Sequence, residues 1–315
     1  MTKYIILFLA TINMAFAQQY PSQPIKVSVP FQSGVALEGR LRAIFQQLEN
    51  QVGQPIVIEN RPSGSSAVAA AHVGASKPDG YTLLVTDDDF LISSYDTNKK
   101  SQHDMSNFVT VAGLLKTKGA AVLVSANSPI NNIQDLVKYA RENPYKVSYA
   151  TNGENGIYHL TTANFAQANK LQLTHVPYKS TLAGIFDVMS GQVTMSTTSV
   201  AQALPLIKDG RVKAIAVTTD VRSPELPNVP TVKEQGSPEW NPRFHIFLLA
   251  PSGTPQEVVD KLSQEISKLQ NNQEFVKREI LDFNYLPFAV TAQGLNSHIT
   301  NFKNEFFRIT KALRQ

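Results

Sequence analysis

Residues 25–52, IKVSVPFQSGVALEGRLRAIFQQLENQV, predict a strand, a tight loop and a helix in succession. Apolar and polar side chains alternate over residues 25–29, which is the period of a strand with one buried face. Pro30 ends this pattern because proline has no N–H to donate to a neighbouring strand. From about Ala36 the apolar residues follow helical spacing, and Gly53 is the type of residue that ends a helix. Open α/β sheets bind ligands at such loops, but ordinary βα connections look the same, so this unit alone leaves both interpretations open.

The same alternation of strand and helix continues along the chain and then restarts. The first set adds strands over 55–59 and 81–85 around an alanine-rich helix over 67–75. The second set has strands over 146–150, 173–176, 193–197 and 212–218, with helices over 157–168, 182–189 and 201–208. There is no repeat of fixed period. The pattern therefore predicts an α/β protein with two similar lobes, each a mostly parallel sheet flanked by helices.

Composition excludes several classes of protein. The chain has 315 residues, of which 42% are hydrophobic and 17% charged, enough for two globular lobes with separate cores. The net charge of +4, without a basic run, argues against a nucleic-acid partner. The absence of cysteine excludes disulfides and thiol chemistry. No catalytic motif and no pair of histidines at metal-ligand spacing is present, so we expect no metal, no cofactor and no enzyme activity.

The N-terminus has the pattern of a secretory signal peptide. Lys3 precedes an apolar run over residues 4–10, and Ala15-Phe16-Ala17 is a small-x-small cleavage site. The run is too short to span a membrane. We expect residues 1–17 to be a signal peptide, cleaved after Ala17. The alternative interpretation is a buried N-terminal helix.

Nine short motifs, weak alone, are specific in this order and over this length. They are YPSQPI (20–25), VPF (29–31), GQPIVIENRP (53–62), PDGYTLL (78–84), SYA (148–150), HVPYK (175–179), GQV (191–193), RSP (222–224) and APSGTP (250–255). From Tyr20 to about Leu313, the chain resembles the substrate-binding proteins of tripartite tricarboxylate transporters, the Bug family of periplasmic receptors.

The resemblance implies a two-lobed, type II periplasmic binding protein fold that closes over a ligand by hinge motion. Residues 18–121 and 245–315 would form the first lobe and residues 122–244 the second, with crossing segments near 122–125 and 243–247. The protein would be a periplasmic monomer that captures a small, carboxylate-containing molecule for membrane transporter subunits. The alternative is a sensor that signals to a membrane kinase. Neither role needs a cofactor.

In the first lobe, the resemblance places ligand contacts in two loops. The predicted residues are Phe31, Gln32, Ser33, Gly34, Val35, Glu38, Thr86, Asp87 and Asp88. The family pattern Pro-Phe-x-Pro-Gly-Gly-x-x-Asp is altered here, because only one glycine remains and Glu38 replaces the aspartate. The β-branched Val35 fits poorly at positive φ, so the loop backbone could differ from the family's. Glu38 either favours the helix dipole or faces the ligand.

The acidic run Asp87-Asp88-Asp89 stands where the family has small hydroxyl residues or glycine. It is either solvated or lines the pocket. At ~4 Å and an effective dielectric constant near 20, each pair of like unit charges costs roughly 4 kcal/mol. If one or two of these acids line the pocket, the ligand is neutral, zwitterionic, cationic or singly anionic rather than citrate-like.

In the second lobe, the resemblance places a ligand-cradling loop before the helix predicted over 157–168. The predicted residues are Thr151, Asn152, Gly153, Tyr158, His159, Tyr178, Thr197 and Thr198. The alternative for His159 is a buried, hydrogen-bonded structural role. The loop amides and hydroxyls of both lobes would then hold the ligand, without a dedicated arginine.

Overall fold

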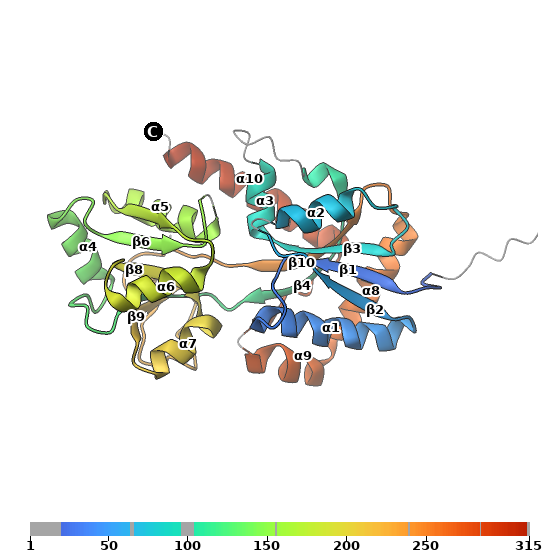
Figure 1. Cartoon of the computed structure of the whole chain (residues 1–315), viewed down its shortest axis with the longest axis horizontal. Helices are drawn as coiled ribbons and strands as arrows, with labels where there is room; N and C mark the ends of the chain where they lie inside the picture. The colour runs from blue at the N-terminus through green and yellow to red at the C-terminus, as the bar shows by residue number, and fades with distance from the viewer. Residues whose placement is uncertain are drawn as a thin grey trace, which may run out of the picture.

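The structure, a computed structural model, describes residues 20–63, 66–95, 104–154, 156–238, 240–283 and 285–313. The predicted signal peptide lies outside the described residues. Two lobes lie side by side, each built on its own β-sheet (Figure 1). None of the helices in the described ranges is long and apolar enough to span a membrane.

The first sheet has six strands in the order β11-β4-β10-β3-β1-β2. Its strands are β1 (Ile25–Val29), β2 (Ile56–Asn60), β3 (Thr82–Asp87), β4 (Phe108–Thr117), β10 (His245–Pro251) and β11 (Tyr285–Pro287). Successive side chains of a strand point to opposite faces, so Leu83 and Leu84 of β3 join different cores. One core includes α1 (Ala36–Val52), α8 (Gln256–Asn271) and α9 (Gln273–Glu279). The other includes α2 (Ala67–Gly74), α3 (Asp88–Tyr95) and α10 (Ala292–Leu313).

The second sheet has five strands in the order β7-β6-β8-β5-β9. Its strands are β5 (Ala120–Ser125), β6 (Ser148–Thr151), β7 (Thr174–Pro177), β8 (Met195–Ser199) and β9 (Val212–Val217). Val122 of β5 packs with α4 (Ile133–Glu142) and α5 (Ile157–Ala168), whereas Leu123 packs with α6 (Thr181–Ser190) and α7 (Val200–Lys208). Both sheets are therefore covered on both faces. Single 3-10 turns are formed by η2 (Met105–Asn107) and η3 (Leu281–Phe283).

The chain crosses from the first sheet to the second between Thr117 and Ala120 and returns between Val217 and His245. The expected first crossing at 122–125 was therefore wrong, because these residues lie inside β5. The second expected crossing, 243–247, includes the start of β10. A strand that enters a sheet from the side where the other strands end must be antiparallel to them. Accordingly β5 is antiparallel to β8 and β9, and β10 is antiparallel to β3 and β4. Parallel pairs remain among β1, β2 and β3 and among β6, β7 and β8.

Helix α1 spans Ala36–Val52, as the periodicity predicts, and Gly53 ends it in the left-handed conformation with φ 70°. In the loop before it, Gly34 takes the positive φ of 87°, while Val35 stays extended at φ −74°. One glycine thus suffices for the turn, and the β-branched Val35 is not strained. Helix α3 begins at Asp88 and was not predicted, because an acidic run is equally typical of a solvated loop.

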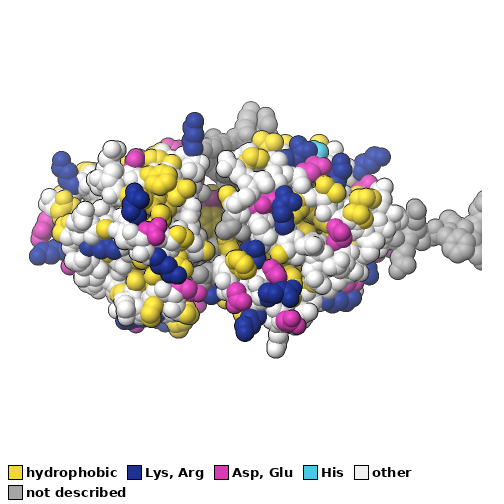
Figure 2. Space-filling view, turned by 60° about the horizontal axis from the view of Figure 1, so that its bottom comes forward, with side chains coloured by type: hydrophobic (Ala, Val, Ile, Leu, Met, Phe, Trp, Pro, Cys, Tyr) yellow, Lys and Arg dark blue, Asp and Glu magenta, His cyan; other side chains and the backbone are white. Residues whose placement is uncertain are grey.

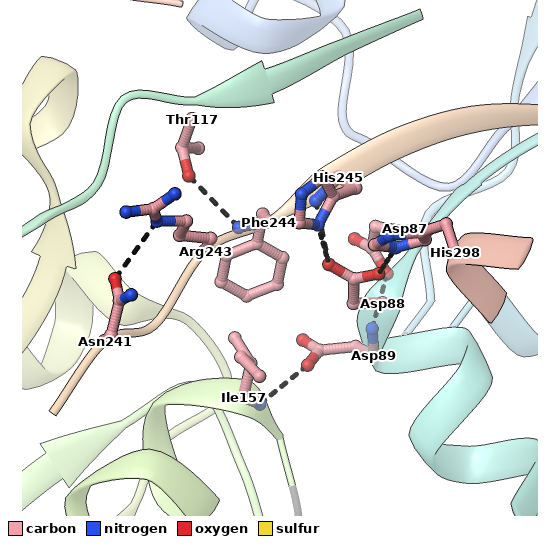
Figure 3. Close-up of polar contacts among 10 residues, drawn as sticks. All are labelled: Asp87, Asp88, Asp89, Thr117, Ile157, Asn241, Arg243, Phe244, His245 and His298. Carbon is pink, nitrogen blue, oxygen red and sulfur yellow. Dashed lines mark hydrogen bonds and ion pairs between the residues drawn. The ribbon is translucent and has the colours of Figure 1, made fainter. Parts of the chain in front are cut away.

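A buried carboxylate joins three elements of the first lobe (Figure 3). Asp88 Oδ2 accepts hydrogen bonds from the backbone N–H and from Nδ1 of His245, both at 2.8 Å, and Oδ1 accepts one from Nε2 of His298 at 3.3 Å. Asp88 is fully buried, and the two histidines lie on β10 and α10. Burial alone would raise the pKa of Asp88, but the hydrogen bonds and charge of His245 and His298 outweigh it and lower the pKa. Asp88 thereby fixes α3 and α10 to the strand on which the chain re-enters the lobe.

We expect the substitution Asp88→Asn to lower the free energy of unfolding by about 3–5 kcal/mol at pH 7, as removing one partner of a buried ion pair does. The folded-state pKa is depressed, so the carboxylate stabilises the fold above its unfolded pKa of about 3.9 and ceases to do so as pH falls through the folded value. Urea unfolding at several pH values should show a constant gap between the two proteins from pH 7 to about 5 that shrinks below about pH 4. The exposed Asp282, changed to Asn, is the control. Equal stabilities of Asp88→Asn and the native protein at pH 7 would contradict this role.

Candidate functional site

The carboxyl ends of β1 and β3 point toward the second lobe, so the loops that follow them lie at the boundary between the lobes (Figure 1). Figure 2 shows the surface hollowed between the lobes, with acidic and basic side chains interspersed on both sides. This arrangement is the one in which open α/β sheets bind ligands, with strand-end loops and helix N-termini facing one space.

The buried side chain of Glu38 stabilises the loop between β1 and α1. This side chain is buried and pairs with Arg42, and it accepts hydrogen bonds from the Gly34 N–H at 3.3 Å and from Asn60 Nδ2 at 3.4 Å. Asn60 Nδ2 also donates to the Phe31 carbonyl at 3.0 Å. The contacts of Glu38 thus serve the loop itself. Four of the predicted residues in this loop are exposed: Gln32, Ser33, Gly34 and Val35.

The three adjacent acids point in three directions, because the chain changes from strand to helix within them. Asp88 turns into the first lobe and binds His245 and His298. Asp87 Oδ1 accepts the backbone N–H of Asp89 at 3.1 Å. Burial, and then the charges of Asp89 and Asp88, raise the pKa of Asp87 well above its ordinary value. The preceding Thr86 is buried and donates to Ser66 Oγ at 2.8 Å.

Asp89 reaches the other lobe (Figure 3). Its Oδ1 accepts the backbone N–H of Ile157, the first residue of α5, at 2.8 Å, and its Oδ2 accepts from Asn152 Nδ2 at 3.4 Å. Burial raises the pKa of Asp89 to about 6, although the hydrogen bonds from Ile157 and Asn152 act in the opposite direction. Among the candidate residues chosen from the sequence, Asp89 was missed. The acidic run pointed to this region of the sequence. However, the different directions of the Asp87, Asp88 and Asp89 side chains depend on where α3 begins, which the sequence did not show.

The loop between β6 and α5 is tied mainly within its own lobe. Thr151 Oγ1 donates to the Gly153 carbonyl at 2.8 Å and contacts Nε2 of His175 at 2.7 Å. The His159 ring stacks on His175 with 3.9 Å between centroids, and burial lowers the pKa of His159. These contacts give His159 a place in a stack of rings inside the second lobe. Asn152 is the predicted residue of this loop that contacts the first lobe, through Asp89.

The remaining predicted residues, apart from Tyr158, have their contacts within the second lobe. Tyr158 is buried and lies edge-on to Phe244 with 5.1 Å between ring centroids, next to the second crossing. The Tyr178 hydroxyl donates to Asp187, and Thr198 Oγ1 donates to Gln202 Oε1 at 2.6 Å. Thr197 is buried on β8. Of the predicted residues, Asn152 contacts the first lobe through Asp89, and Tyr158 belongs to an apolar cluster with Ile92 and Phe306 of the first lobe.

A separate cavity of about 500 Å³ lies between α5 and α10, and the residues that line it include none of the predicted site residues. Its apolar walls include Ile92, Leu160 and Phe306, which also form an apolar contact between the lobes. His245 and His298 line it as well, and with Asp88 they offer metal-ligand atoms within 4.8 Å of one another. Both oxygens of that carboxylate already accept hydrogen bonds, so the cluster is satisfied without an ion.

A family model described as "Tripartite tricarboxylate transporter family receptor" matches residues 41–314. A UPF0065 protein of Pseudomonas sp. (strain P51) is 33% identical over 250 residues, which cover 79% of this chain and 74% of the relative. A solved structure described as a periplasmic transporter is 28% identical with a TM-score of 0.81, covering 93% of this chain and 97% of that one. An R. palustris protein solved with adipate is 25% identical with a TM-score of 0.82, covering 93% and 98%.

The sequence matches extend through both sheets, and the structural matches reproduce the two-lobed fold. The predicted fold class is thus confirmed, and so is the resemblance that was based on the nine motifs. The chain belongs to the receptor family of tripartite tricarboxylate transporters.

Proposed function

We propose that this chain is an exported receptor that captures a small, carboxylate-containing molecule in the groove between its lobes and delivers it to the membrane subunits of a tripartite tricarboxylate transporter. The observation that carries the proposal is the contact of Asp89 with Ile157, which brings the start of α3 in one lobe against the N-terminus of α5 in the other. The adipate in the R. palustris relative supports a carboxylate as the ligand.

The ligand would be held by backbone amides and hydroxyls of the two lobes. The exposed segment from Gln32 to Val35 would offer its backbone N–H groups other than that of Gly34, which Glu38 accepts, and Gly34 gives the turn of the loop. From the same lobe Phe31, Glu38, Thr86, Asp87 and Asp88 position this surface. From the other lobe Thr151, Asn152, Gly153 and the N-terminus of α5, with Tyr158 and His159, would face it. Tyr178, Thr197 and Thr198 would form its far wall.

The protein would act by closing, as a monomer and without chemistry. The lobes would move as units divided near residues 118–119 and 244, where the chain crosses between the sheets. Capture without turnover requires neither a cofactor nor a metal ion. The signal peptide would direct the chain to the periplasm, where such a receptor meets its ligand.

A carboxylate that binds this groove should stabilise the folded protein. At one hundred times its Kd, a ligand adds about 2.7 kcal/mol, a rise in Tm of several degrees for a chain of this size. A thermal-shift screen of carboxylates should find such a compound, small-angle scattering should show a more compact particle with it, and the compound should be recovered unchanged. Failure of every carboxylate to raise Tm, or consumption of the compound that does, would contradict the proposal.

The substitution Gly34→Ala should weaken binding of the compound found in that screen. Gly34 has φ 87° and no atom within 4 Å of an added Cβ, so the substitution strains the loop without a clash. Gly191 has φ 81° and equally open surroundings, and it caps the C-terminus of α6. It is therefore the matched control. Both variants should lose similar stability, about 1 kcal/mol, but only Gly34→Ala should raise the Kd, by about tenfold. Equal Kd values in the two variants would exclude the loop from the site.

Export should remove residues 1–17 and leave Gln18 as the first residue of the mature chain. The small side chains of Ala15 and Ala17 fit the cleavage site that signal peptidases require. Intact-mass measurement of the protein from a periplasmic extract checks this directly. A full-length mass in that extract would support the alternative of a retained N-terminal helix.

A further inference from the structure

The N-terminus of α5 receives its cap from the opposite lobe. In the second lobe, α4, α6 and α7 are each capped by their own N-cap side chains, Asn132, Ser180 and Ser199. Helix α5 has Gly156 at this position, which has no side chain to offer. The acceptor at its first N–H is the carboxylate of Asp89, at 2.8 Å. Ordinarily such an acceptor comes from the residue just before the helix.

The surroundings of this contact are built around the carboxylate. A Cβ on Gly156 would lie in van der Waals contact with Asp89 Oδ1, at 3.4 Å, so the carboxylate packs directly against the residue before the helix. Asn152 Nδ2 donates to the second carboxylate oxygen at 3.4 Å. The backbone N–H of Asp89 is held by Asp87 at 3.1 Å, which fixes the start of α3. Asp89 therefore sits in an anion site formed by a helix N-terminus and a side-chain amide.

A polar atom at the same place lacks a donor. Asn152 Oδ1 is buried and has no hydrogen-bond partner among the described residues. With its Nδ2 engaged by Asp89, the amide presents an acceptor beside a carboxylate. Two acceptors side by side, one of them charged, suit a group that donates hydrogen bonds and carries positive charge, such as a primary ammonium.

On the basis of the receptor function proposed above, we propose that Asp89 is a specificity-determining residue: it fills the anion site of α5 with a carboxylate of the protein itself, so that the receptor selects an amino-bearing carboxylate and rejects a dicarboxylate. The ligand's own carboxylate binds the amides of the β1–α1 loop. Its ammonium group lies against Asp89 and Asn152. A second carboxylate there meets the charge of Asp89 and finds the helix N-terminus occupied.

The direct test compares ligands that differ only at one end. Titration calorimetry should be run with succinate against 4-aminobutyrate and adipate against 6-aminohexanoate, pairs with equal numbers of carbons. The native protein should bind at least one amino compound tenfold or more tightly than its dicarboxylate partner. Asp89→Asn keeps the size and an acceptor oxygen but removes the charge, and should reduce that ratio at least tenfold. Asp282→Asn, an exposed acid of the same lobe, should keep the native ratio.

A second measurement needs no ligand. Hydrogen exchange of peptides covering residues 156–160 should be faster in Asp89→Ala than in the native protein, because the N–H of Ile157 loses its acceptor. If hydrogen exchange in this segment were the same in Asp89→Ala and the native protein, Asp89 would not cap α5. An unchanged ratio in Asp89→Asn, a native preference for dicarboxylates, or no binding of any of the four compounds would overturn the ligand class. The wider thermal-shift screen judges the receptor function separately, since a hit there with a dicarboxylate would uphold the receptor and refute the role of Asp89.

Discussion

Both crossings between the lobes occur at the end of each sheet where the parallel strands finish. The rest of the architecture depends on this constraint. A chain that leaves one lobe where its parallel strands end must enter the other lobe on the side where the parallel strands of that lobe end. Strands β5 and β10 therefore run against their neighbours. The same constraint turns the strand-end loops of both lobes, and the helix N-termini behind them, toward a common space. The groove is thus a consequence of connectivity, and side chains only decide what it accepts.

Three consecutive carboxylates show how that decision is made. A buried charge is costly unless it is paired and hydrogen-bonded, so each acid needs partners within reach. Asp88 finds two histidines inside its own lobe and becomes part of the framework. Asp89 finds the backbone of the opposite lobe and becomes part of the groove. Their different surroundings, rather than their shared chemistry, separate an acid bound inside one lobe from an acid that contacts the other lobe.

Much of the fold could be predicted from local pattern. The periodicity of residues 25–52 predicted β1 and α1, and the restart of the alternation predicted a second lobe. The pattern failed where contacts are non-local. His245 and His298 are far apart in sequence, and only the folded chain brings their rings together beside Asp88, so neither was a candidate. Helix α3 was missed because acids at a helix start look like a solvated turn.

The candidate site was less predictable than the fold for the same reason. Family position predicted that the Asn152 loop and the acidic run lie at the groove, but which acid crosses it depends on side-chain direction at a single helical turn. Glu38, for which two roles were open, is engaged with the loop and Arg42, as its burial requires.

We propose that one molecule is held between the strand-end loops of the two lobes. A crystal structure of the protein with the ligand that remains bound through purification is the decisive measurement. We expect density for that ligand between the loop at Gly34 and the N-terminus of α5, in contact with both lobes. Density confined to the cavity between α5 and α10, or to one lobe alone, would contradict it.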